Sequence, residues 1–578
     1  MNQNPVVGID LGTTNSLVGM VSEGKVRLFA DEQGNELLPS VVGFESRGVV
    51  VGRAAKNRRL LDPAGTVASI KRKMGTTERA RVGEKELSAP QVSSLILSAL
   101  LDRVEKAIGV RPRRAVITVP AYFDNLQREA TRDAGELAGL TVERLVNEPT
   151  AAAVNYQSGR EERVLVYDLG GGTFDVSVLE RDAGFLEVKA SRGDTHLGGD
   201  DIDRALVEWV LGHLGADAKR TVEGDPRGLT RLVEAAERAK IALSAREEVK
   251  LTEPFLAGEG DGAVHVDLTV ARADLEEIAT PFIARTIACV EEALRDAKLS
   301  PMELDRVLLV GGSSKMPLVA RRMEEHLGRP VTLDEAADRA VALGASLLAG
   351  RLAGEAVNEV LVDITPHTLA AGALDQFGEM SAVPIIARDS VIPAERTQTV
   401  FTERDNQPGA HIPIVQGEHH ALEENTWLGE VAIEDLPPSP QGSPVEVRFR
   451  LDLSGVLLVD AKHLPSGRSA TTTITKAPTR LTALTRASAA SEVQALRRAT
   501  AAESPEPPLP PADEKLARAM ILRAERAIAG ATSASPGPLA AAETALRDVR
   551  DALASPTTGL HEKLDALSDR LLDLVDAG

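Results

Sequence analysis

The chain has 578 residues, of which 43% are hydrophobic and 26% charged, and its formal net charge is −20. This length suits about three to four domains, and the negative charge argues against a general nucleic-acid role, which needs a basic patch. The single cysteine, Cys289, excludes an internal disulfide and a cysteine zinc cluster. No apolar run approaches the length of a membrane span, and residues 1–5 lack the features of a signal segment, so we expect a cytoplasmic protein of bacterial type.

Three segments share one pattern, a buried apolar strand followed by a glycine-containing turn. They are strand 6–9 with turn 10–16, strand 164–167 with turn 168–175, and strand 307–310 with turn 311–314. Glycines let the backbone approach a ligand closely, and their N–H groups can face a phosphate. The pattern predicts two similar lobes with one nucleotide between them. The sequence has no Walker-type lysine loop, so it does not predict a P-loop protein.

Aspartates flank the glycines of the turn at 168–175. Carboxylates at Asp168 and Asp175 could hold a hydrated cation, and Mg²⁺ prefers a few carboxylates together with waters and phosphates. This turn therefore predicts a magnesium–nucleotide site.

Successive parts of the chain have different apolar patterns, which predict different kinds of structure. Residues 1–357 alternate β runs with helical stretches, which predicts an α/β architecture. Apolar residues alternate with polar ones from Val445 to Leu453, which predicts a half-buried strand and a hairpin with residues 456–459. We expect Cys289 to lie in the core side of a helix at 282–294.

The C-terminal part, from residue 477, is Ala-rich and helical in pattern. A Pro-rich run at 504–511 predicts a stiff extended linker, and residues 535–538 predict a break between helices. Two apolar seams predict a small helical bundle. One seam is Leu539, Ala542, Leu546, Val549 and Leu553, and the other is Leu560, Leu564, Leu567, Leu571 and Leu574.

Five segments carry a family pattern. They are Ile9–Ser16 (IDLGTTNS), Ile117–Phe123 (ITVPAYF), Asn147–Ala153 (NEPTAAA), Asp168–Asp175 (DLGGGTFD) and Gly193–Asp200 (GDTHLGGD). In them the chain resembles the seventy-kilodalton heat-shock chaperones, the DnaK-like family. The resemblance is nearly unbroken over residues 1–365, looser to about residue 476, and fades beyond.

The resemblance implies a multidomain protein with four parts. These are a two-lobed, actin-like α/β ATPase domain (1–357), an apolar interdomain linker (358–365), a β-sandwich peptide-binding domain (366–476) and a short α-helical lid bundle (477–578).

A nucleotide site follows from the same resemblance, with ATP or ADP, Mg²⁺ and K⁺ as a further ion. It implies catalytic roles for Lys71, Glu148, Asp175, Thr173 and Asp10, and Mg²⁺ held through water by Asp10 and Asp168. Further nucleotide contacts are implied for Gly12, Thr13, Thr14, Asp168, Gly170, Gly171, Gly172, Gly198, Gly199, Glu237, Lys240, Ser244, Gly311, Gly312, Ser313 and Asp338.

Coupling residues are implied in the same way. Pro120 and Arg128 relay the nucleotide state in the family, Arg144 and Asn147 match positions used by J-domain co-chaperones, and Asp363 matches a coupling aspartate of the linker. Thr195 matches a threonine that bacterial members phosphorylate on themselves.

The sequence departs from the family pattern in places. Residues 75–90 are shorter than usual, which puts contacts with a nucleotide-exchange factor in doubt. The segment 369–377 replaces the usual pocket strand and is about four residues longer. Loops tolerate insertions of this kind. Glu403 and Ala410 fall near pocket positions, so a peptide preference cannot be carried over.

The expected function is an ATP-dependent chaperone that takes part in protein folding and the stress response. It would bind extended apolar segments of unfolded or client proteins, with ATP hydrolysis controlling affinity. Expected partners are such polypeptides, a J-domain co-chaperone and an exchange factor, with no nucleic acid and no membrane. Alternatives are a dedicated-client chaperone, for example of the iron–sulfur scaffold type, a small-molecule kinase on the same scaffold, and an actin-like filament protein.

Overall fold

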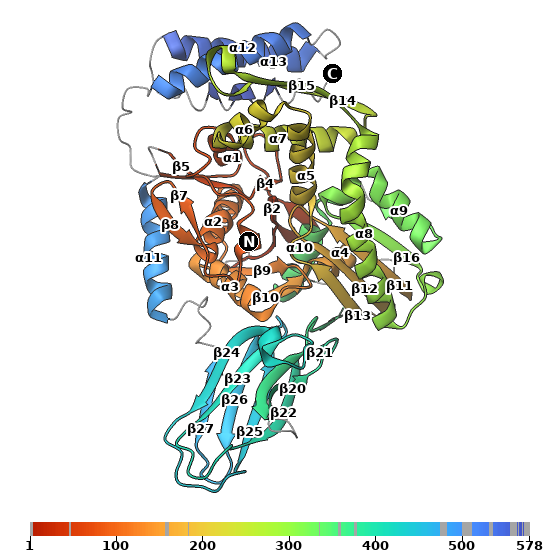
Figure 1. Cartoon of the computed structure of the whole chain (residues 1–578), viewed down its shortest axis with the longest axis vertical. Coiled ribbons are helices and arrows are strands. Elements are labelled where there is room, and N and C mark those ends of the chain that lie inside the picture. Colours follow the sequence, from red (N-terminus) through yellow and green to blue (C-terminus); the bar gives the residue numbers. More distant parts are fainter. Residues whose placement is uncertain are drawn as a thin grey trace. The chain divides into compact units, whose positions relative to one another are not determined.

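The computed structural model describes most of the chain (Figure 1). The described residues are 4–45, 48–156, 161–182, 184–333, 336–355, 360–374, 379–473, 483–499, 511–530 and 536–554, with positions 563–564, 566–568 and 570–571. Its internal contacts divide the chain into one unit of residues 1–43 and 51–496 and another of residues 44–50 and 497–578.

The first lobe is built on a mixed sheet in the order β10-β9-β1-β2-β3, with β4 added beside β2. Its central strand β1 pairs in parallel with β9 and antiparallel with β2, so the predicted strand at 6–9 is confirmed. The strands are β1 (Val6–Leu11), β2 (Asn15–Ser22), β3 (Lys25–Leu28), β4 (Leu38–Pro39), β9 (Arg114–Val119) and β10 (Thr141–Asn147).

The second lobe has a seven-stranded sheet in the order β17-β16-β11-β12-β13-β18-β21. The predicted strands at 164–167 and 307–310 lie in neighbouring parallel strands, so their glycine turns leave the sheet at the same edge. The strands are β11 (Glu162–Leu169), β12 (Phe174–Asp182), β13 (Phe185–Asp194), β16 (Arg306–Val310), β17 (Thr332–Leu333), β18 (Val360–Ile364) and β21 (Val391–Ile392).

Helices surround the two sheets, as predicted for an α/β fold. They are α1 (Arg53–Arg59), α2 (Ala89–Ile108), α3 (Asn125–Leu137), α4 (Glu148–Asn155), α5 (Gly199–Gly212), α6 (Ala216–Glu223), α7 (Pro226–Leu243), α8 (Arg272–Ala297), α9 (Pro317–Leu327) and α10 (Ala340–Leu352). Short β pairs are β5 (Val42–Glu45) with β6 (Gly48–Val51), β7 (Arg79–Val82) with β8 (Lys85–Ser88), and β14 (Glu248–Ala257) with β15 (Val264–Ala271).

Two of these helices cross at a very close distance. A Cβ atom at Gly344 of α10 would lie 1.7 Å from the carbonyl oxygen of Ala151 in α4, so only glycine fits. Because α10 also packs on β1 and β2, this crossing ties α4 to the first sheet. The predicted helix at 282–294 lies within α8, where Cys289 is partly buried against the core.

The next part of the chain is a β-sandwich, as predicted. Its two four-stranded sheets have the orders β20-β19-β23-β24 and β22-β25-β26-β27. Val445, Val447, Phe449 and Leu451 are buried, whereas Leu453 lies beyond the strand and is 49% exposed. The strands are β19 (Leu369–Leu374), β20 (Met380–Ile386), β22 (Ala394–Phe401), β23 (Ala410–Gln416), β24 (Thr426–Ile433), β25 (Pro444–Leu451), β26 (Leu457–His463) and β27 (Ser469–Thr473).

The C-terminal part is helical. Its helices are α11 (Ala483–Ala499), α12 (Pro511–Gly530) and α13 (Pro536–Ala554). In the second unit, side chains of both predicted seams meet in one apolar cluster that includes Leu546, Val549, Leu564, Leu567 and Leu571. Leu560, Leu574 and residues 504–510 of the expected linker lie outside the described residues.

Candidate nucleotide site

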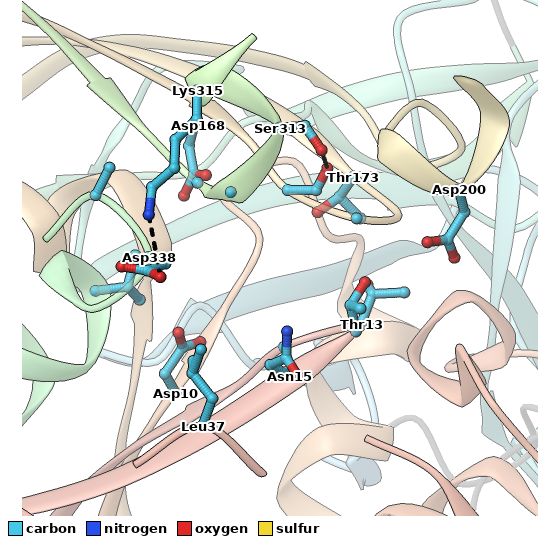
Figure 2. A pocket seen from close by; sticks show the side chains of 18 of the residues that line it. Asp10, Thr13, Asn15, Leu37, Asp168, Thr173, Asp200, Ser313, Lys315 and Asp338 are labelled. Carbon is cyan, nitrogen blue, oxygen red and sulfur yellow. Dashed lines mark hydrogen bonds and ion pairs between the residues drawn. The ribbon is translucent and has the colours of Figure 1, made fainter. Parts of the chain in front are cut away.

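A cavity of about 380 Å³ lies between the two lobes, and Figure 2 shows ten of its side chains labelled. Most of the predicted nucleotide residues line it. They are Asp10, Gly12, Thr13, Thr14, Lys71, Glu148, Asp168, Gly170, Gly171, Thr173, Glu237, Lys240, Ser244, Gly311, Gly312, Ser313 and Asp338. The cavity thus joins the three glycine turns that the sequence places far apart.

The glycine turns of the two lobes touch each other. A Cβ atom at Gly171 would lie 1.8 Å from the hydroxyl oxygen of Thr14, and one at Gly198 would lie 2.4 Å from the carbonyl oxygen of Gly171. Ser313 from the third turn donates a hydrogen bond of 2.9 Å to the carbonyl oxygen of Gly170. Side chains at these glycines would therefore force the turns apart.

The predicted glycines that do not line the cavity lie directly behind it. The amide of Gly199 donates to the carbonyl oxygen of Gly170 over 3.0 Å, and the amide of Asp200 donates to that of Gly171 over 2.8 Å. Gly198 and Gly199 thus fix the turn at 170–172 to the start of α5, and Gly172 lies beside Thr13. Their contribution is to shape the turn.

Four buried carboxylates and one buried lysine, predicted from the sequence for catalysis and Mg²⁺ binding, lie close together; Asp10, Glu148, Asp168 and Lys71 line the cavity, whereas Asp175 does not. The Nζ of Lys71 makes an ion pair with Oε1 of Glu148. Asp10 Oδ1 accepts a hydrogen bond of 3.0 Å from the hydroxyl of Thr118. The cross-strand partner of Asp168 is Asp175, so these two carboxylates leave adjacent strands at one level.

This group of side chains has more acidic than basic members. Burial and the nearby Glu148 carboxylate raise the pKa of Asp10 to about 7, although Lys71 lowers it. The same two causes raise the pKa of Asp175 to about 7 and that of Asp168 well above its usual value. One lysine cannot neutralise four carboxylates, so the site has the electrostatic character of a place for a further cation.

The other end of the cavity combines charged and apolar side chains. Lys240 donates to Asp203 over 2.7 Å, and Lys56 from the first lobe pairs with Glu237 over 2.8 Å. Lys315 lies 3.2 Å from Asp338. The cavity lining also includes residues that the sequence analysis missed, among them Leu37, Asp203, Ile241, Met316 and Val341.

The structure also brings four of the predicted coupling residues together. Arg128 donates to Asn147 Oδ1 over 2.8 Å, and Asn147 Nδ2 donates to Asp363 Oδ1 over 2.9 Å. Arg144 lies near enough to Asp363 for that carboxylate to oppose the lowering of the arginine pKa by burial. Pro120 directly follows β9, whose last residue, Val119, pairs with Asn147.

Thr195 lies apart from these groups. Its hydroxyl lies 3.1 Å from Nδ1 of His196, and it does not line the cavity. Self-phosphorylation at Thr195 stays a prediction.

Comparison with known proteins identifies the family. The family model of the "Hsp70 protein" matches residues 6–82 and 77–505. The chain is 42% identical over 490 residues to the chaperone protein DnaK of Mycoplasmoides gallisepticum, covering 82% of this chain and 81% of the relative. It is 41% identical over 481 residues to the chaperone protein DnaK of Thermotoga petrophila, covering 81% and 80%. The chain belongs to the Hsp70 family, as an ATP-dependent chaperone of the DnaK-like type.

These matches agree with the two-lobed domain, β-sandwich and C-terminal helices described above, and none of them favours a kinase or a filament protein. Within the described part of the chain, no helix is both long and apolar enough to cross a membrane.

Proposed function

We propose that the cavity between the lobes binds Mg²⁺–ATP and hydrolyses it, and that hydrolysis controls how firmly the β-sandwich holds an extended client polypeptide. The observation that carries this proposal is the buried ion pair of Lys71 and Glu148 beside the glycine turns. The protein would act in the cytoplasm, on unfolded or extended chains.

Catalysis would rest on positioning and electrostatics, which dominate phosphoryl transfer. The ammonium of Lys71 would stabilise the charge that develops on the transferred phosphoryl group. Glu148 holds that ammonium in place and, with Asp175, would orient the attacking water. Thr13 and Thr173 would offer hydroxyl groups to the phosphates from opposite lobes.

The carboxylate set fits a magnesium ion that is bound through water. The described residues offer no group of three ligating side chains close enough to hold one ion directly. Asp10 and Asp168 would therefore contact its water shell. Burial and the neighbouring carboxylates raise the pKa of both groups, and a bound cation would favour their ionised forms. The ion would neutralise phosphate charge when bound.

Coupling to the β-sandwich would pass through β18, the strand formed by the linker. It pairs in parallel with β13 of the second lobe, and its Asp363 contacts Asn147. A J-domain co-chaperone would act on this cluster at Arg144 and Asn147. The short β7–β8 hairpin takes up the region that is longer in relatives, so an exchange factor would find a smaller first lobe there.

The test is single-turnover ATP hydrolysis by the full chain and its Lys71→Ala variant. We expect the variant to lose at least a hundredfold in rate while ATP affinity changes less than about threefold, because the ammonium acts mainly in the transition state. Lys73→Ala is the matched control, since Lys73 belongs to the same short helical segment but is 41% exposed and pairs with Glu78. Loss of ATP binding in the Lys71 variant would show a structural role instead.

The client role is tested by adding a panel of unrelated extended apolar peptides. Several-fold acceleration by several peptides supports a general chaperone. Acceleration by one client only supports the dedicated-client alternative, which the changes at Glu403 and Ala410 keep open.

A further inference from the structure

A single residue, Tyr122, lies between the catalytic carboxylates and the β-sandwich. Its backbone amide donates a hydrogen bond of 3.0 Å to Oδ1 of Asp175. Its carbonyl oxygen lies 3.1 Å from Nε2 of His367, a residue just before β19. The two sides of one residue therefore contact the catalytic centre and the β-sandwich.

The contact between Tyr122 and His367 has a second component. The two rings meet edge to face, with centroids 4.3 Å apart and an interplanar angle of 61°. Aromatic ring pairs favour this edge-to-face geometry. Both the ring and the carbonyl of Tyr122 are thus held by the same histidine.

The contact with His367 is one of three hydrogen bonds that hold the carbonyl groups of the loop after β9. Arg128 of α3 donates to the carbonyl oxygens of Ala121, over 3.0 Å, and Phe123, over 3.2 Å. The carbonyl of Tyr122 lies between these two and is held by His367. Three successive carbonyls are therefore fixed, two from within the ATPase domain and one from the β-sandwich.

The chemical state of His367 follows from its partner. A carbonyl oxygen only accepts hydrogen bonds, so Nε2 must carry the proton. Burial lowers the pKa of His367, and Arg128 and Arg192 lower it further, against the opposing effects of the Tyr122 carbonyl and of Glu418. The imidazole is therefore a neutral Nε2–H donor at neutral pH.

Hydrogen bonds from the linker and from the β-sandwich hold the backbone at and next to His367. Glu418 accepts from the amide of Thr368 over 2.9 Å and from its hydroxyl over 2.8 Å. The carbonyl of His367 accepts from the hydroxyl of Thr365 over 3.1 Å. Movement of the sandwich would carry His367 with it and release the carbonyl of Tyr122.

We propose that His367 is a positioning residue through which the seating of the β-sandwich sets the orientation of Asp175, by way of the Tyr122 peptide groups. This inference rests on the proposed role of Asp175 in hydrolysis. The donor at Nε2 is the essential feature, because it holds the loop whose amide orients the carboxylate.

The experiment compares full-length His367→Leu with His367→Gln. Leucine has a similar size without a donor, whereas glutamine supplies an N–H group on a chain of comparable reach. The first readout is the ratio of single-turnover hydrolysis rates with and without a saturating apolar peptide. The second is hydrogen exchange of the segment 120–126 in the ATP-bound protein.

We expect His367→Leu to reduce the peptide-dependent rate ratio at least threefold and to speed exchange of the segment about tenfold. His367→Gln should stay within twofold of the wild type in both, and ATP affinity should be unchanged in both variants. An unaltered ratio and exchange in His367→Leu, or equal defects in the two variants, would overturn the proposal.

A failure of the proposed function gives a different result. In that case the wild type itself shows no peptide effect on hydrolysis, and the exchange measurement alone decides the inference. Faster exchange in His367→Leu but not in His367→Gln would support the contact, and equal exchange in all three proteins would refute it.

Discussion

At the scale of single residues, Asp175 makes stability depend on pH. Its pKa is raised to about 7 by burial and by Glu148. A carboxyl with a raised folded-state pKa contributes most stability below its unfolded value of about 4, and that contribution is lost as the pH rises to about 7. The nucleotide-free protein should therefore lose stability across this range.

Asp175→Asn removes this titration. We expect the thermal stability of the nucleotide-free variant relative to the wild type to rise by several kcal/mol between pH 4 and pH 7 and to stay level above, as followed by scanning calorimetry. Asp405→Asn is the control, because Asp405 lies in an exposed loop of the β-sandwich. A difference between variant and wild type that does not change with pH would contradict the electrostatic account.

Arg72 connects the two lobes beside the glycine turn at 170–172. Its Nη1 donates to Asp201 Oδ1 over 2.9 Å and its Nη2 contacts Oδ2, while Asp201 also accepts from the amide of Gly198 over 2.8 Å. A lysine cannot make the two-pronged contact. We expect Arg72→Lys to lower kcat/KM for ATP about tenfold, equivalent to about 1.4 kcal/mol.

Arg204→Lys is the matched control for this prediction. Arg204 contacts the same carboxylate over 3.0 Å, but its side chain is 62% exposed, so an effect below twofold is expected. Both substitutions keep the positive charge, so an unchanged kcat/KM in Arg72→Lys would show that only the charge near Asp201 matters. Equal losses in both variants would contradict a special role for the two-pronged contact of Arg72.

The sequence allowed a prediction of those parts of the candidate site whose residues stand in contiguous motifs. The turns at 10–16 and 168–175 carry their own glycines and aspartates, so a shared site could be predicted from them. The structure brings residues of both turns to one cavity, and their chemistry stays a prediction. Leu37, Ile241 and Val341 come from three distant segments and look like ordinary core residues, so only folding shows that they share one cavity. Ile241 offers one sequence signal, because it directly follows Lys240, a predicted nucleotide contact, on α7.

At the scale of elements, the linker shows what an apolar sequence pattern can predict and what it cannot. The resemblance predicted an apolar linker at 358–365, and the structure gives its partner strand and its register, in which Leu361 lies opposite Leu186 in β13. A short strand has no side-chain pattern that names its partner strand, because pairing depends on backbone groups. The β-sandwich was easier to predict, since the alternation in β25 continues over a whole strand.

This register yields a prediction for Leu361, which is only 7% exposed. We expect Leu361→Asp to detach β18, because burying an unpaired carboxylate is unfavourable by several kcal/mol. Peptides should then no longer change the single-turnover rate, whereas ATP affinity stays within twofold. Val360→Asp serves as the control because Val360 is 37% exposed, and loss of coupling in that variant alone would contradict the register.

At the scale of the whole molecule, four charged residues join the β-sandwich to the second lobe. Arg192 in β13 and Asp296 in α8 make an ion pair within the ATPase domain, and Arg388 lies 3.6 Å from its neighbour Asp389 in the sandwich. Across the domains, Arg192 donates to the two oxygens of Asp389 over 3.4 and 3.2 Å, and Arg388 lies 3.6 Å from Asp296. When the two domains separate, each keeps an arginine–aspartate pair of its own, Arg192 with Asp296 and Arg388 with Asp389.

This arrangement makes domain contact reversible. Separation of an ordinary buried ion pair strands a charge, which is costly, whereas here each arginine retains a carboxylate. We expect Asp389→Asn to shift the equilibrium toward separated domains by about 1–2 kcal/mol, measured by energy transfer between fluorophores on the two domains in the ATP state. Salt between 0.05 and 0.5 M should separate the wild-type domains more than those of the variant, because the partly exposed Asp389 is open to screening. The control variant Asp405→Asn should behave as the wild type does. If Asp389→Asn and the wild type respond identically to salt, the contact between the domains depends on apolar and neutral polar groups and not on this ion pair.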